Sequence, residues 1–151
     1  MTAQGLESLE HSVHLTRAWI KDLDQRLRWD DKPRSYRLLI AVLHALRDSL
    51  QIKDAIDLGT PLPGLLRGAY YEQWHPTEQP VKASTVDALI ARVNESFLKD
   101  PLADPPMAVM AVFQHLATKI AEGANENIKR CLPKELRGIW TDYAKSTSGP
   151  H

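Results

Sequence analysis

The chain has 151 residues, of which 43% are hydrophobic and 25% are charged, close to an ordinary globular composition. Lysine and arginine number 19 together, as do aspartate and glutamate, so the formal net charge is zero. A protein that binds nucleic acid usually carries a basic face, and the balance therefore favours no nucleic-acid partner. A chain of this length can bury most of its apolar surface, which predicts one compact domain over residues 1–151.

The single cysteine, Cys131, excludes an intramolecular disulfide and fits a reducing compartment. Residues 1–10 lack the basic segment and the apolar segment of a secretory signal. The longest apolar stretches, such as residues 107–113, are far shorter than the roughly 20 residues of a membrane-spanning helix. We therefore expect a cytoplasmic protein with no membrane partner.

The first predicted helix extends from Leu6 to Arg28. Apolar or small residues recur along it with a seven-residue period, which is typical of a helical apolar stripe. The stripe consists of Leu6, Leu9, Val13, Thr16, Ile20, Leu23 and Leu27. Its N-terminal part has no counterpart later in the chain, and one interpretation of this extension is homo-oligomerisation through Leu6, Leu9 and Val13.

Three more helices are predicted in the first half of the chain. The second helix begins after Pro33, because proline in a first turn after aspartate is a helix-start signal. A short third helix over residues 52–58 stops at Gly59, a typical C-cap residue. The fourth helix starts at Pro63 and ends near Trp74. No segment shows the period-2 alternation that predicts a strand.

Residues 18–68 align with residues 88–138 at a constant offset of 70 without a gap. The identities include Ala41-Val42 with Ala111-Val112, Leu62-Pro63 with Leu132-Pro133, and Leu66-Arg67-Gly68 with Leu136-Arg137-Gly138. Such self-similarity indicates duplicated units that bury their faces against each other. The predicted fold is therefore all-α, with about eight helices in two tandem four-helix units, residues 6–74 and 84–145, packed as one compact bundle.

The helices of the second unit follow from the same alignment. One starts near Ser84, where Ser84-Thr85-Val86-Asp87 resembles a capping box, and the next starts after Asp104-Pro105. The last two are expected near residues 124–130 and from Pro133 to Lys145. Residues 75–83, which contain two prolines, form the predicted linker, and residues 146–151 are predicted to be disordered.

Three segments together resemble a known family. They are AVLHALRD at residues 41–48, LPGLLRGAYYEQW at residues 62–74 and LPKELRGIW at residues 132–140. They are similar to the bacterial family called domain of unknown function 2267. The resemblance covers about residues 15–143, and the pattern LPxLLRGxYYExW is its most specific part. The resemblance implies a helical bacterial protein and no established activity.

The fourth predicted helix carries an aromatic second face. Arg67, Tyr71 and Trp74 lie at helical spacing opposite its apolar stripe, with Tyr70 at the border and His75 directly after. The second unit has no aromatic residue at the positions equivalent to Tyr71 and Trp74. Because Tyr, Trp and Arg are enriched at interaction hot spots, we predict that these five residues bind a protein partner. The alternative is that this face packs beneath the linker or against the other unit.

Two pairs of charged residues are identical between the units, namely Arg67 with Arg137 and Asp30 with Asp100. One interpretation is a pair of anion sites. The other is that each arginine binds an aspartate or the carbonyl groups at a helix end, which fixes the fourth helix against the turn after the first. Duplication favours the structural interpretation, because each unit must fold.

Two groups of side chains have spacings seen at metal sites. Glu72 and His75 match half of a di-iron helix motif, but the second unit supplies no second half. Glu7, His11 and His14 share a helix face, and a solvated surface is the simpler interpretation. No metal and no cofactor are therefore predicted.

Catalytic signals are weak. His44 and Asp48 are spaced as a possible general-base pair, although no nucleophile accompanies them. Cys131 lies near a predicted helix start that could lower its pKa, whereas a buried and inert thiol is the default. No phosphate-binding loop or hydrolase motif occurs, and no catalytic residue is predicted.

The predicted function is a non-enzymatic helical protein-interaction module of unknown pathway in a bacterial cytoplasm, with an unidentified protein partner. The alternative is a small-molecule or metal-binding protein, with or without enzymatic activity. Its site would lie in the cleft between the two units and use Glu72, His75, His44 or Arg67.

Overall fold

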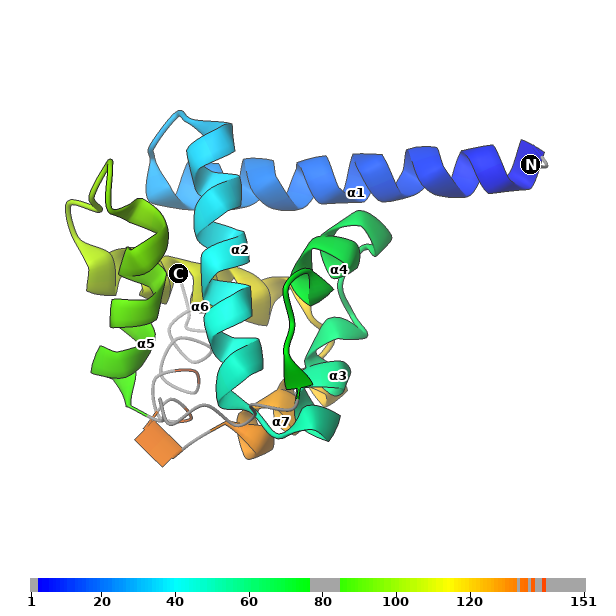
Figure 1. Cartoon of the computed structure of the whole chain (residues 1–151). Coiled ribbons are helices and arrows are strands. Elements are labelled where there is room, and N and C mark those ends of the chain that lie inside the picture. Colours follow the sequence, from blue (N-terminus) through cyan, green and yellow to red (C-terminus); the bar gives the residue numbers. More distant parts are fainter. Residues whose placement is uncertain (1–2, 77–84, 133, 136, 138–139, 141–151) are drawn as a thin grey trace, which may run out of the picture.

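The computed structural model describes residues 3–76, 85–132, 134–135, 137 and 140 (Figure 1). Helices and their connections make up these residues, and no strand occurs among them. The first half forms α1 (Ala3–Leu27), α2 (Lys32–Ser49), α3 (Ile52–Gly59) and α4 (Gly64–Tyr71). The second half forms α5 (Val86–Asn94), the 3-10 helix η2 (Glu95–Phe97), α6 (Pro105–Lys119) and α7 (Glu122–Cys131). An all-α fold is thereby confirmed.

Several predicted boundaries move. Helix α4 ends at Tyr71 instead of near Trp74, because the backbone turns extended at Glu72 and Gln73 then has a φ of 60°. Helix α5 begins one residue later than the capping box suggests, with Thr85 as its N-cap. The predicted eighth helix, the linker beyond Pro76 and the C-terminal tail fall mainly outside the described residues.

Helices α2 and α6 begin with the same local structure. Asp31 precedes α2 with φ −150° and ψ 82°, and its carboxylate accepts a hydrogen bond from the Arg34 amide. Asp104 precedes α6 with φ −140° and ψ 83°, and its carboxylate accepts from the Met107 amide. The proline signals in the sequence therefore mark real helix starts, since each aspartate satisfies an amide that the first turn leaves unpaired.

The turn between α1 and α2 is fixed by a buried carboxylate. Asp24 accepts hydrogen bonds from the Ser35 hydroxyl at 2.7 Å and from the Asp31 amide at 3.0 Å. Arg28 and Asp30, which follow α1, have φ values of 58° and 49°. These left-handed residues reverse the chain, and the bonds to Asp24 hold α2 across α1 in that orientation.

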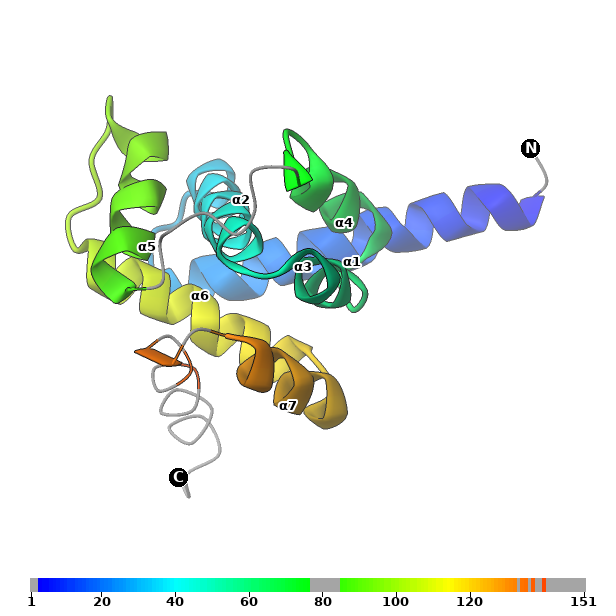
Figure 2. The ribbon, with the colours of Figure 1, turned by 60° about the horizontal axis from the view of Figure 1, so that its bottom comes forward.

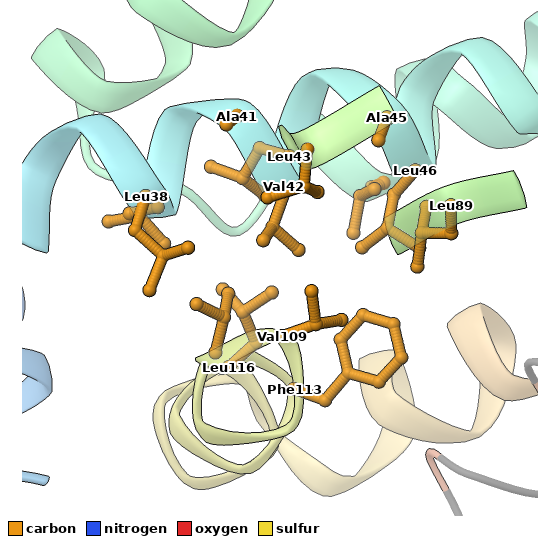
Figure 3. Close-up of a cluster of buried hydrophobic side chains, with 14 of the residues drawn as sticks. Leu38, Ala41, Val42, Leu43, Ala45, Leu46, Leu89, Val109, Phe113 and Leu116 are labelled. Carbon is orange, nitrogen blue, oxygen red and sulfur yellow. The ribbon is translucent and has the colours of Figure 1, made fainter. Parts of the chain in front are cut away.

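Helices from both halves share the hydrophobic core. Helix α1 packs against α2 and α6, and α2 also packs against α5 and α6. Figure 3 shows side chains of α2 facing those of α6, with Leu89 of α5 beside them. The labelled core residues are Leu38, Ala41, Val42, Leu43, Ala45, Leu46, Leu89, Val109, Phe113 and Leu116. The two predicted units are therefore not separate bodies, because this core joins them.

Helix α1 is the longest element and extends well past the rest of the molecule (Figures 1 and 2). Its C-terminal half lies across α2 and α6, whereas its N-terminal half projects beyond α4. Every residue from Leu6 to His11 is exposed. None of the helices within the described ranges has the length and apolar character needed to cross a membrane.

Candidate functional site

Arg67 binds the carbonyl groups that end α3. Its guanidinium donates hydrogen bonds to the carbonyl oxygens of Leu62 at 2.9 Å, Gly59 at 3.2 Å and Thr60 at 3.3 Å. Arg137 makes the equivalent bonds to the carbonyl oxygens of Arg130 and Leu132, both at 3.2 Å. These contacts agree with the structural interpretation, in which each arginine binds carbonyl groups at a helix end. They also engage the guanidinium group that an anion would otherwise bind.

The duplicated aspartates do not bind these arginines. Asp100 instead forms ion pairs with Arg34 and Arg37, which both approach it from α2. The bond from Arg37, followed by the charges of both arginines, lowers the pKa of the Asp100 carboxyl group. Arg34 and Arg37 also lie over the ring of Phe97, so this charged cluster attaches the end of η2 to α2.

Tyr70 belongs to the core, which removes it from the predicted partner-binding surface. Its side chain is 0% exposed, and its hydroxyl donates a 2.5 Å hydrogen bond to the carbonyl oxygen of Ala55. Burial raises the pKa of this phenol far above its usual value. The contact holds α4 against α3, and a partner could not reach the ring without unfolding that contact.

The other aromatic residues of the predicted surface are half-buried. The rings of Tyr71 and Trp74 lie 5.6 Å apart, and the Tyr71 hydroxyl donates to the carbonyl oxygen of Ile56 at 3.4 Å. His75 is exposed and lines a different hollow from the one that Glu72 lines. The five predicted residues therefore have different positions. Arg67 binds the end of α3, Tyr70 lies in the core, and the edge positions are those of Tyr71, Trp74 and His75.

A polar cavity of about 650 Å³ lies between α2 and the α5–η2 segment. It lies between the two halves of the chain, where the alternative function predicts a site, and His44 and His75 line it, whereas Glu72 and Arg67 do not. Its charged and polar lining includes His44, Arg47, Asp48, His75, Arg92 and Glu95. Groups of both charges thus surround one hollow.

The wall of this cavity is built on Arg47, which sequence reasoning missed. Its side chain is 2% exposed and donates to the carbonyl oxygens of Tyr70 at 2.6 Å and Glu72 at 2.8 Å. Asp48 bridges Arg47 at 2.8 Å and Arg92 of α5 at 2.7 Å. The sequence did contain one signal. Arg47 is a charged residue beside the apolar face of α2, and its equivalent in the second half is Ala117.

His44 does not pair with Asp48 as a general base would. Its Nε2 lies 2.8 Å from the carbonyl oxygen of Ala69, which can only accept, so Nε2 carries the proton. Burial lowers the pKa of His44, which keeps the ring neutral at pH 7. The lone pair of the neutral ring is then on Nδ1, and His44 is one of the residues that line the cavity.

Within the described part of the chain, the geometry supports neither a metal site nor an activated thiol. Among the residues that the structure describes, no group of three or more His, Cys, Asp or Glu side chains is placed to hold a metal ion. Cys131 lies at the end of α7, and its thiol donates to Asp54 at 3.1 Å. Burial and this carboxylate raise the pKa of Cys131 to about 11, so the thiol is less acidic than usual instead of activated.

The most exposed apolar feature of the long helix is the stripe on the projecting half of α1. Leu6, Leu9 and Val13 are 53%, 48% and 37% exposed. The stripe meets α4 where the Ser12 hydroxyl accepts a 3.0 Å hydrogen bond from the amide of Leu65, which is itself 48% exposed.

Beside this junction, α1, α2 and α4 form a groove of about 560 Å³. Its apolar lining includes Val13, Ile20, Tyr36, Leu65 and Gly68. Helix α1 therefore carries an exposed stripe in one half and lines an open groove in the other half.

These features define an all-helical protein with an exposed apolar stripe and a polar cavity between helices. The chain belongs to the family described as an uncharacterized conserved protein, DUF2267, whose profile matches residues 16–139 and confirms the resemblance. No curated protein matches the chain. The matched region starts at Thr16, so the projecting turns of α1 lie outside it.

Proposed function

We propose that this protein is a non-enzymatic helical interaction module, whose protein partner binds the stripe on the projecting half of α1. The observation that carries the proposal is the exposure of Leu6, Leu9 and Val13 on one face of a helix that leaves the body of the protein. A contiguous apolar surface on a water-soluble fold marks an interaction site, whereas scattered exposed leucines are ordinary.

The stability of the projecting half supports the same proposal. Residues 6–11 are all exposed, so little tertiary packing stabilises these turns in helical form. Isolated helices shorter than about 12–15 residues are marginal in water, and most helices are stabilised by packing an apolar face. A partner on the stripe would provide that packing.

The residues of the aromatic face have supporting places in this proposal. Tyr71 and Trp74 are half-exposed with their rings 5.6 Å apart, and exposed His75 follows them, so we assign these three residues to a secondary contact with the partner, separate from the α1 stripe. Arg67 and Tyr70 act from beneath, because they fix α4 to α3. The proposal thus moves the centre of the surface to α1, keeps Tyr71, Trp74 and His75 as partner contacts, and gives Arg67 and Tyr70 a supporting role only.

We also propose that the chain consists of two tandem repeat units and works in a bacterial cytoplasm. Equivalent hydrogen bonds of Arg67 and Arg137, at an offset of 70, support the repeat. The family resemblance and the single unpaired thiol support the compartment.

The test is affinity capture from a bacterial lysate with three forms of the protein. Wild type is compared with Leu6→Gln/Leu9→Gln, which removes the stripe, and with Leu98→Gln, a matched control at a leucine that is 78% exposed. We expect one set of proteins to be captured by wild type and the control and lost with the double variant. Equal capture by all three forms would reject the stripe as the binding surface.

A second candidate function is the binding of a small polar molecule in the cavity of about 650 Å³. The observation that favours it is the neutral His44 ring, which lines the cavity together with the charged residues Arg92 and Glu95. A panel of small metabolites should then raise the melting temperature of wild type but not of His44→Gln/Arg92→Gln. No shift with any member of the panel would count against this candidate.

A further inference from the structure

We propose that the partner of the α1 stripe is a second copy of this chain, bound antiparallel so that each stripe fills the other copy's α1–α4 groove. The inference rests on the proposed function and names its partner. Three features support it, namely the apolar stripe on α1, the groove that α1 lines and the distribution of charge along α1.

The stripe and the groove lie on one continuous heptad series. Leu6, Leu9 and Val13 occupy its exposed positions, and Ile20 continues the series into the groove. In an antiparallel pair of α1 helices, the first half of each helix lies along the second half of the other. Leu6 and Leu9 of one copy then lie over Ile20 and Leu65 of its partner, and Val13 lies near the two-fold axis.

The shape of the groove suits a helix. Gly68, on the α4 side of the groove, would meet nothing within 4 Å if it carried a Cβ, so the groove is open there. Tyr36 of α2 and Leu65 of α4 add apolar surface to the groove beside α1. A two-fold interface of this kind is self-complementary and closed, because the same stripe and the same groove are used twice.

The charges along α1 select the antiparallel orientation. Residues 3–16 contain Glu7 and Glu10 but no lysine or arginine. Arg17 and Lys21 follow in the second half of the helix, where Arg17 lines the groove and both residues line a neighbouring hollow. An antiparallel pair therefore brings acidic residues of one copy beside basic residues of the other, whereas a parallel pair would oppose like charges.

The experiment measures the mass of the full-length protein in solution by light scattering over a range of concentrations. Wild type should form a dimer, Leu6→Gln/Leu9→Gln should stay a monomer, and Leu98→Gln should behave as wild type. The substituted side chains are exposed, so circular dichroism should show a folded protein in all three forms, and the double variant should lose at most the helicity of the projecting turns of α1. A monomeric wild type at all concentrations, or a dimer that tolerates the stripe variant, would overturn the proposal.

Charge exchange tests the orientation. Glu7→Lys/Glu10→Lys and Arg17→Glu/Lys21→Glu should each weaken the dimer about tenfold at low salt, because both place like charges across the interface. The variant with all four substitutions should regain wild-type affinity, since opposite charges again face each other. In a parallel pair the four-fold exchange would restore nothing, and that result would reject the antiparallel arrangement.

Cross-linking gives an independent readout of the register in a Cys131→Ser background. Val13→Cys should be joined to its copy by a short bismaleimide, whereas Leu6→Cys should not, because the two copies of position 6 would lie about 20 Å apart along the axis. If the protein is monomeric but lysate capture still depends on Leu6 and Leu9, self-association fails and the interaction module stands. If the protein is monomeric and all three forms capture the same proteins, both proposals fail.

Discussion

Helices α2 and α6 reach the same core from the two halves of the chain, and the comparison separates what the fold requires from what is particular to each half. Both begin with an aspartate cap of nearly equal backbone angles, and both end at a buried aliphatic residue, Leu50 or Ile120. Their N-caps are 73 positions apart, whereas their C-caps are 70 apart. Helix α2 thus contains about one additional turn at its start, at the point where it crosses α1.

The buried positions agree more closely than the helix ends. Leu46 and Leu116 are identical equivalents and are both 0% exposed, and Leu43 and Phe113 are similarly buried. Tyr70 bonds to the backbone of Ala55, and Trp140, its equivalent, bonds to the side chain of Asn125, the equivalent of Ala55. The halves therefore share a packing scheme but satisfy the polar atoms of their large aromatic residues with different partners.

The largest expected effect tests whether this shared packing makes one cooperative unit. Leu46→Ala and Leu116→Ala each remove a fully buried side chain and should each lower the free energy of unfolding by about 3 to 5 kcal/mol. Because α2 and α6 share the core, both variants should shift one common denaturant transition, followed by helicity and by tryptophan fluorescence at a fixed protein concentration.

A matched control is Ile56→Ala on α3, whose side chain is 46% exposed and which should change stability much less. Two separate transitions, of which each variant moved only one, would show that the halves unfold independently.

Much of this fold could be predicted from the sequence, because apolar periodicity and Asp-Pro signals act locally. The burial of Tyr70 was predictable from the sequence. Its equivalent, Trp140, is also a large aromatic residue, and a feature kept in both halves is expected to be structural. The end of α4 could not be predicted, since the turn at Gln73 depends on Arg47 binding the carbonyl groups of Tyr70 and Glu72.

The second difference between the helices is His115, which stands where α2 has Ala45. His115 is 0% exposed, its ring lies edge-on to Trp19 at 5.7 Å, and neither ring nitrogen has a hydrogen-bond partner among the described residues. Burial, followed by the positive charges of Lys119 and Arg26 and opposed by Asp22, lowers the pKa of His115 to about 4.

This burial predicts an acid-sensitive fold. The unfolded chain binds the His115 proton near pH 6.5 and the folded chain only near pH 4, so stability is full above pH 6.5 and falls as the pH decreases through that window. The loss should reach about 3 kcal/mol, measured by urea unfolding at a series of pH values. His115→Leu should remove most of this slope.

Other titrating groups define the control for that experiment. His44 also has a lowered pKa and contributes in the same direction, so His44→Gln should remove a smaller part of the slope. The carboxyl groups of Asp22 and Asp100 have lowered pKa values and lose their stabilising charge only below about pH 4. A slope between pH 6.5 and 4 that His115→Leu leaves unchanged would contradict the assignment.

The functional surfaces were harder to predict than the core, because they depend on which helix faces remain uncovered. The stripe on α1 was visible in the sequence, but a stripe of the same period is also what a buried helix shows. Only the packed structure distinguishes exposed Leu6 from buried Leu23 on the same series. The cavity could not be predicted either, because no sequence motif indicates that α2 and α5 lie side by side.

The smallest expected effect concerns two glycines in equivalent short helices. Gly59 was predicted to cap the end of α3, but it is the last helical residue, Thr60 is the C-cap, and the φ of Gly59 is not positive. Its role is close approach: a Cβ at Gly59 would lie 2.7 Å from the Tyr71 hydroxyl and 3.0 Å from Cε2 of Tyr70. Gly123 in α7 has nothing within 4 Å of the same position.

Alanine should therefore have opposite effects at the two glycines. Gly123→Ala should stabilise the protein by about 0.5 to 1 kcal/mol through helix propensity alone. Gly59→Ala should destabilise it by about 1 to 3 kcal/mol, because Tyr70 is held by its bond to Ala55 and cannot move away from the added methyl group. Adding Tyr71→Phe to Gly59→Ala removes the nearest atom and should restore part of the loss. If Gly59→Ala instead stabilised the protein as Gly123→Ala does, the packing of α4 onto α3 would have to be looser than these distances indicate.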